Sequence, residues 1–117
     1  MIAKVPAYLV HDMKRGGLRF HHRVASDPND MHDHPWDFAS LILHGCYLEH
    51  TPQGEHLHRA TTVVVHAAED VHRLELPEGD VWTYVHTGPV RRRWGFWTDS
   101  GWVHCRDYLA HASSRVW

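Results

Sequence analysis

Two histidines separated by one residue are the part of this sequence best suited to chemistry. His32 and His34 stand directly before an apolar run at residues 38–43. In a β-strand, residues two apart point to the same face, so both imidazoles could reach one metal ion. A helix would instead pair its ligands at positions i and i+4. His72 lies on another strand-like segment and is a third candidate. The three histidines predict a metal site, because a set of structural or surface histidines gives no reason for this spacing.

Short strand-like segments must position these histidines. Residues 18–24 alternate between two faces, and this parity places His22 on the side of Leu18 and Phe20. Further strands are expected at residues 38–43, 46–50, 56–66, 71–76, 81–87, 91–98 and 102–109. Many short strands with turn residues between them indicate an all-β sandwich or barrel. Only the first dozen residues and the tail from Tyr108 onward leave room for a short helix.

The composition is that of one ordinary globular domain. Of the 117 residues, 43% are hydrophobic and 22% are charged, which is enough for a sizeable core. A net charge of -2 gives no electrostatic reason to expect a nucleic acid or an anionic membrane as partner. No apolar run approaches the ~20 residues that span a bilayer, and the start of the chain lacks the features of a secretory signal. With two cysteines and no disulfide framework, we expect a cytoplasmic protein with free thiols.

The histidine pattern resembles that of the cupin superfamily, whose fold is a double-stranded β-helix, or jelly-roll barrel. In its first motif, G(x)5HxH(x)3–4E(x)6G, the two histidines are matched by His32 and His34, and Gly45 falls at the closing glycine. In its second motif, G(x)5PxGxxH(x)3N, only the histidine is matched, by His72, which follows His34 by 38 residues. The resemblance covers about residues 18–108 and extends to small single-domain bacterial and phage cupins with an HxHPW sequence. It implies that residues 1–117 form a single all-β cupin domain.

One departure from the cupin motif concerns the metal. Phe38 and Ala39 stand where the family has its ligand glutamate, and neither can bind a metal. A three-histidine site remains, with open positions for water, O2 or substrate. Such a site is similar to those of thiol and diketone dioxygenases, which hold Fe(II). The resemblance therefore implies one divalent transition metal, with Fe(II) first and Zn, Mn, Ni or Cu as alternatives, since imidazole suits several of them. Neutral ligands leave the full charge on the metal, which favours an anionic, chelating substrate.

A carboxylate could still reach the site from the following strand. If residues 44 and 45 form a two-residue hairpin loop, Glu49 shares the face of the predicted ligands. Glu49 is then a candidate fourth ligand or proton-transfer group. Tyr47, on the same face, and Tyr84 are further candidates for handling protons.

Aromatic and basic residues are the candidates for a substrate pocket. Trp36, Phe38 and Trp94 either line a cavity or fill the core of a small barrel, and filling the core is the commoner role. His22 faces inward by parity, either as a hydrogen-bonded barrel residue or as a group beside the metal site. Residues 91–93 are three arginines, for which a solvated face or ion pairs is the ordinary interpretation. One inward arginine, Arg93, could anchor a substrate carboxylate.

These features favour a dioxygenase-like, O2-dependent oxidoreductase that acts on a small organic molecule. Two alternatives stay open: a non-redox metal-dependent isomerase, lyase or hydrolase, and a non-catalytic ligand-binding or sensory cupin. Nucleophilic catalysis has little support, because neither Cys46 nor Cys105 has the flanking sequence of a catalytic thiol. Many cupins dimerise by sheet packing, so a homodimer is also compatible with the resemblance.

Overall fold

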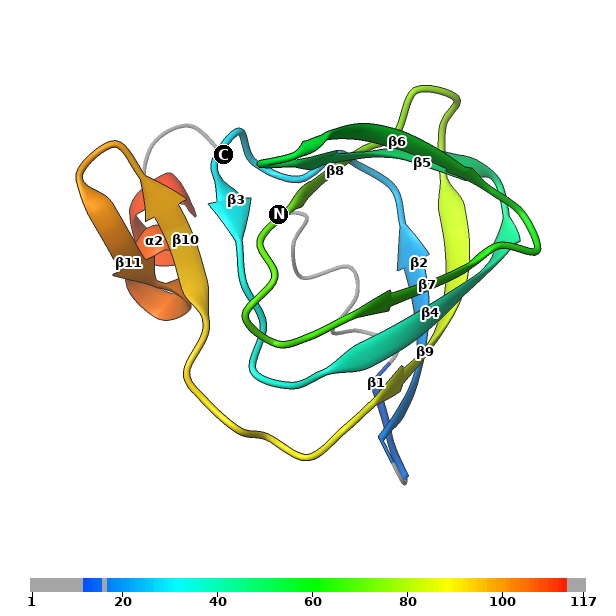
Figure 1. Ribbon diagram of the computed structural model, residues 1–117, viewed down its shortest axis with the longest axis horizontal. Coiled ribbons are helices and arrows are strands. Elements are labelled where there is room, and N and C mark those ends of the chain that lie inside the picture. The colour runs from blue at the N-terminus through cyan, green and yellow to red at the C-terminus, as the bar shows by residue number, and fades with distance from the viewer. Residues whose placement is uncertain (1–11, 16, 114–117) are drawn as a thin grey trace.

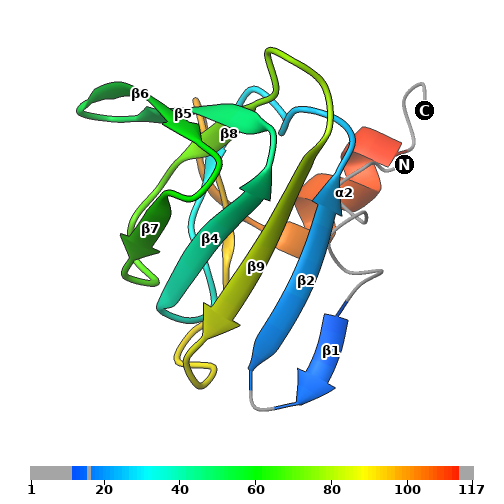
Figure 2. The same cartoon turned by 90° about the vertical axis from the view of Figure 1, so that its right-hand side faces the viewer.

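Eleven short β-strands form three antiparallel sheets in the computed structural model of the protein, which describes residues 12–15 and 17–113 (Figure 1). The five-stranded sheet, seen in Figure 2, has the order β1 (Asp12–Arg15), β2 (Leu18–Arg23), β9 (Val81–Thr87), β4 (Phe38–His44) and β7 (Val63–His66). One three-stranded sheet has the order β11 (Gly101–His104), β10 (Gly95–Thr98) and β3 (Met31–His32). The other has the order β6 (Gly54–Arg59), β5 (Cys46–Thr51) and β8 (Arg73–Glu75). Helix α2 (Cys105–Ser113) follows β11. The prediction of an all-β fold is confirmed.

The sheets curve around a common interior. Figure 1 looks along this barrel, with β5 and β6 on one side and β4, β7 and β9 on the other. Burial of apolar side chains between these two walls holds them together. The buried cluster contains Ile42, Val64 and Val81 from the large sheet and Tyr47 and Leu74 from the small one.

The step from β4 to β5 differs from the predicted hairpin. Strand β4 pairs with β7 and β9, whereas β5 pairs with β6 and β8, so the two consecutive strands belong to different sheets. The single residue between them is Gly45, with φ at +87°. A Cβ at Gly45 would lie 2.6 Å from the backbone oxygen of Asp80. The chain therefore turns a tight corner here that only glycine fits without strain.

The parity predicted for β2 is reversed, so the prediction that His22 faces inward is wrong. His21 is buried, whereas His22 stacks on Trp82 of β9 with ring centroids 3.9 Å apart. Phe20 lies on the same face, with its ring centroid 5.0 Å from that of Trp82 and 6.2 Å from that of Tyr84. These aromatic contacts cover the outer face of the large sheet. Arg19, His21 and Arg23 of β2 consequently turn toward the interior.

Smaller differences concern the ends of elements. The segment predicted as one strand over residues 56–66 is two strands, β6 and β7, separated by a turn in which Thr61 has φ at +74°. Residues 91–94 are not in a strand. The helix predicted from Tyr108 onward begins at Cys105, and the helix considered for the first dozen residues falls mainly on residues 1–11, outside the described part. None of the helices that the structure describes has the length and apolar character needed to cross a membrane.

Candidate metal centre

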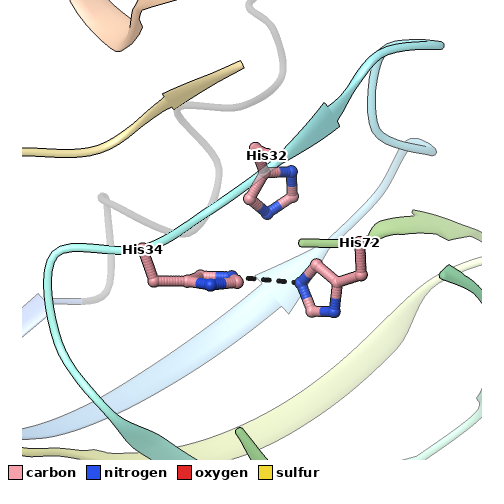
Figure 3. A group of neighbouring side chains, drawn as sticks. All are labelled: His32, His34 and His72. Atoms are coloured by element: carbon pink, nitrogen blue, oxygen red, sulfur yellow. Dashed lines mark hydrogen bonds between the residues drawn. The ribbon is translucent and has the colours of Figure 1, made fainter. Parts of the chain in front are cut away.

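His32, His34 and His72 converge inside the barrel, as Figure 3 shows. All three are buried, with exposed fractions of 4%, 6% and 5%. One ring nitrogen from each lies within 4.8 Å of the other two, and the Nε2 atoms of His34 and His72 are 3.1 Å apart. Two nitrogens that bind one ion at about 2.1 Å and at right angles to each other are about 3.0 Å apart. The spacing of these two imidazoles therefore fits a shared metal ion.

Backbone pairing brings the distant segments of the site together. The amide of His32 donates to the carbonyl of His72 at 2.9 Å, and the amide of His72 donates to the carbonyl of His32 at 3.0 Å. The amide of His34 donates to the carbonyl of Ala68 at 3.0 Å. The two bonds between His32 and His72 form an isolated antiparallel bridge, which places His72, directly before β8, beside the end of β3.

The side chain between those of the two histidines is held by hydrogen bonds on the opposite side of this extended segment. Asp33 is 1% exposed, and its carboxylate accepts from the Gly95 amide at 2.8 Å and from the indole nitrogens of Trp97 and Trp102, each at 3.1 Å. Arg92 donates to the same carboxylate at 3.2 Å. Because neighbouring side chains of an extended segment point to opposite sides, holding Asp33 in this way turns His32 and His34 toward the same interior.

The surroundings of His32 and His34 favour the neutral form of both rings. Burial lowers the pKa of His32 well below its ordinary value, and the charges of His72 and His34 lower it further. Burial likewise lowers the pKa of His34, with His72 and His66 adding to the effect. A neutral imidazole keeps a lone pair for a metal, and nitrogen donors suit divalent transition metals. The three residues therefore fit the metal that the cupin resemblance implies.

Glu49 lies on the far side of His72 from His34. Its Oε2 accepts from Nδ1 of His72 and from Nε2 of His66, each at 2.5 Å, and its Oε1 accepts from Nε2 of His58 at 2.9 Å. Although burial opposes it, the hydrogen bonds from His66, His72 and His58 hold the pKa of the Glu49 carboxyl well below its ordinary value. Glu49 thus contacts His72 but does not line the cavity, and the hairpin register used to predict it is wrong. Its role as a fourth ligand or proton-transfer group stays a prediction.

A cavity of about 270 Å³ lies beside the three histidines. Its lining includes the aromatic residues Trp36, Phe38 and Trp94, three of the five pocket residues predicted from the sequence, together with Tyr47. The ring centroid of Phe38 lies 4.6 Å from that of His34. His32, His34 and His72 also line the cavity, so a molecule bound in it would lie next to the metal-ligand candidates.

Basic residues of β2 form another part of the cavity wall: Arg19, His21 and Arg23. The guanidinium carbon of Arg19 lies 5.4 Å from the ring centroid of Trp36, and Arg23 donates to Asp27 at 2.8 Å. Sequence reasoning missed these three residues because it assigned the strand the opposite parity. The sequence feature that could have indicated them is the alternation of residues 18–24, if the face with Arg19, His21 and Arg23 is taken as the inward one.

Two other predicted site residues lie away from the cavity. Arg93 is exposed, and its guanidinium carbon is 6.0 Å from the ring centroid of Trp102. Tyr84 is 39% exposed on the outer face of β9, because the inward residues of that strand are Val81, Thr83 and Val85. The predictions that Arg93 lines the pocket and that Tyr84 transfers protons there are therefore corrected.

Known proteins resemble this chain in structure. No family model matches it, and no curated protein matches its sequence. A cupin-2 domain protein from Shewanella frigidimarina is 12% identical, with 64% of this chain and 74% of that chain covered and a TM-score of 0.52. A conserved protein from Klebsiella pneumoniae with a double-stranded β-helix domain is 12% identical, with coverage of 68% and 71% and a TM-score of 0.54. A sugar phosphate isomerase of the cupin superfamily from Silicibacter pomeroyi is 14% identical, with coverage of 74% and 64% and a TM-score of 0.52. At these identities the likeness is one of fold.

Proposed function

Because the chain has the double-stranded β-helix, or jelly-roll, fold of the cupins, we propose that it is a metal-dependent cupin that acts on a small organic anion. In this proposal His32, His34 and His72 bind one divalent transition metal. The observation that carries it is the convergence of three buried imidazoles at the wall of a cavity.

The preferred reaction is a dioxygenase-like oxidation. If His32, His34 and His72 hold Fe(II), the metal would mediate the transfer of electrons from the organic substrate, which is oxidised, to O2, which is reduced. The aromatic wall of Trp36, Phe38 and Trp94 keeps bulk water from the reacting groups. Burial raises the pKa of Tyr47, so its hydroxyl keeps its proton and can donate a hydrogen bond to a bound substrate.

The cavity indicates the class of substrate. Its volume of about 270 Å³ suits a molecule of metabolite size. The guanidinium groups of Arg19 and Arg23 in its wall are suited to a carboxylate, which arginine binds through paired hydrogen bonds. The aromatic residues of the same cavity suit an apolar portion of the same molecule. We therefore favour a small organic acid as substrate.

A non-redox reaction is the second candidate. Arginines that suit a carboxylate also suit a phosphate, and one structural neighbour is described as a sugar phosphate isomerase. An isomerase, lyase or hydrolase of this kind would use the metal as a Lewis acid only.

Metal analysis and oxygen uptake test the proposal. The protein would be prepared without nickel resin, its metal content measured, and O2 consumption followed with a panel of small organic acids and their neutral amides. About one equivalent of iron and O2 uptake with an acid are expected. Turnover of a substrate without O2 uptake would favour the second candidate. Tight binding without turnover would show a non-catalytic cupin, and absence of any bound transition metal would overturn the proposal.

A further inference from the structure

A buried carboxylate, that of Glu49, contacts one of the three histidines on the side that faces away from the other two. Glu49 is 3% exposed on β5 and contacts three imidazoles, those of His58, His66 and His72. It is not among the residues that line the cavity. Its role must therefore be exerted through the imidazoles that it contacts.

The spacing around Glu49 is that of hydrogen bonds. Glu49, His66 and His72 are close enough to form a second group that could hold an ion. However, Oε2 of Glu49 lies 2.5 Å from nitrogens of both His66 and His72. Two ligands of one ion at about 2.1 Å would be separated by about 3.0 Å or more. The separation between His34 and His72 is thus compatible with a shared ion as well as with a hydrogen bond, whereas the separations of Oε2 of Glu49 from His66 and His72 are compatible with hydrogen bonds only.

The contact with Glu49 determines which nitrogen of His72 carries the proton. A carboxylate only accepts hydrogen bonds, so Nδ1 of His72 donates to it. In the neutral ring, Nε2 then keeps its lone pair and faces Nε2 of His34. This tautomer is the one that a metal between the two histidines requires.

A second set of contacts holds Glu49 in place. Nε2 of His66 donates to Glu49, while Nδ1 of the same ring lies 2.9 Å from Oδ2 of Asp70. The hydrogen bond to Glu49 and that to Asp70 raise the pKa of His66, and the protonated ring can donate to both carboxylates. His58 occupies the other oxygen of Glu49. The carboxylate is therefore fixed at His72 and is not available to turn toward the cavity.

We propose that Glu49 is a positioning residue that fixes the tautomer and orientation of His72 and faces the metal with a negative charge across that imidazole. This inference rests on the proposed function, because it assumes that His72 binds a metal. Carboxylates that hold ligand histidines in this way strengthen metal binding and restrict the rotation of the ring.

Glu49→Gln is the variant that tests the inference, because it keeps the shape of the side chain and removes its charge. Glu75→Gln is the matched control, since Glu75 accepts from Nε2 of His50 at 2.9 Å on the neighbouring strand, away from the site. Affinity for Co²⁺ and Zn²⁺ would be measured by competition with a chromophoric chelator. We expect Glu49→Gln to weaken binding by about 10- to 100-fold and Glu75→Gln to leave it unchanged. Equal affinity in wild type and Glu49→Gln would overturn the inference.

A second measurement uses the metal-free protein. Imidazole ¹H–¹⁵N correlation spectra report the tautomer of His72, with a His72→Gln spectrum to identify its signals. We expect Nδ1–H in the wild type and a mixture of tautomers in Glu49→Gln. If Glu49→Gln fails to fold, Glu49→Asp serves instead, because it keeps the charge but shortens the reach to Nδ1, and it should also lower the Nδ1–H fraction. An unchanged tautomer would overturn the inference.

These outcomes separate the inference from the proposed function. A wild-type protein that binds no transition metal but shows the expected tautomer would reject the metal-dependent function and retain the role of Glu49 in orienting His72. Two equivalents of metal in the wild type and one in Glu49→Gln would show instead that Glu49 is itself a ligand, which would overturn the inference alone.

Discussion

Nε2 of His34 and Nε2 of His72 lie 3.1 Å apart, although the two histidines are 38 residues apart in the sequence. In the metal-free protein a single proton must lie between them, since two nitrogen lone pairs at this distance repel each other. A metal ion replaces that proton and can bind both nitrogens. The geometry therefore favours binding of a transition metal to the folded chain.

Binding to the folded state should raise its thermal stability. An ion at 100 times its dissociation constant adds about 2.7 kcal/mol to the free energy of unfolding. For a chain of this size the midpoint of thermal unfolding should rise by on the order of 10 °C. Differential scanning fluorimetry with Zn²⁺ or Co²⁺ measures this shift, and a chelator should reverse it. Mg²⁺ prefers oxygen ligands and is the control, so an equal shift with Mg²⁺ would argue against a histidine site.

His34→Ala should abolish this stabilisation. The variant removes one of the three buried nitrogens and leaves two, which are too few to hold a transition metal in a stoichiometric complex. We expect the circular dichroism spectrum of the barrel to be retained and the metal-dependent shift to disappear. His86→Ala, on the exposed outer face of β9, is the control. Stoichiometric metal retained in His34→Ala would place the site elsewhere.

The common orientation of the His32 and His34 side chains could be predicted from the sequence because it depends on local geometry. The His-x-His pair needs only an extended chain to place both rings on one side, and His32 and His34 lie in such a segment. The all-β character follows similarly from the alternation of residues and from the turn residues. Both properties depend on residues that are close together in the sequence, so they can be predicted without knowledge of the tertiary structure.

Local sequence did not predict which residues of β2 point inward or which strands pair with β5. Burial of apolar residues usually assigns the inward face of a strand, but here the inward face is a basic cavity wall and Phe20 packs outward on Trp82. The β4–β5 hairpin fails because β5 finds its partners in β6 and β8. Both features depend on long-range contacts. The alternation along β2 therefore does not indicate that Arg19 and Arg23 line the cavity, and the predicted inward arginine, Arg93, is wrong.

Arg19→Gln should reduce the preference of the cavity for anions. Benzoate and benzamide have the same shape and differ in charge, and quenching of tryptophan fluorescence would report their binding near Trp36 and Trp94. Loss of a charge-assisted hydrogen bond should lower the preference for benzoate by about 10-fold or more. Arg59→Gln, on the exposed strand β6, is the control. If the ratio of the two affinities does not change, Arg19 does not bind the anion.

Asp33→Ala should destabilise the whole barrel. The substitution leaves the indole donors of Trp97 and Trp102 and the guanidinium of Arg92 without their buried acceptor. The free energy of unfolding should fall by about 1–3 kcal/mol, the cost of leaving hydrogen-bond donors in the interior without a partner. Urea denaturation of the metal-free protein measures it. The exposed Asp99 provides the control, since Asp99→Ala should change stability by less than about 0.5 kcal/mol.

Gly45→Ala should show how closely the corner between β4 and β5 is packed. Gly45 and Gly79 both have positive φ, at +87° and +101°, so alanine is strained at either position. A Cβ at Gly79 meets nothing within 4 Å, whereas at Gly45 it would lie 2.6 Å from the Asp80 oxygen and 3.2 Å from a side-chain carbon of Val81. Gly79→Ala should therefore cost about 1–2 kcal/mol, the strain of φ alone. Gly45→Ala should cost clearly more in the same urea denaturation experiment, because the backbone of β9 must move. Equal losses in the two variants would mean that the corner is loosely packed, with β4 and β5 free to separate at this point.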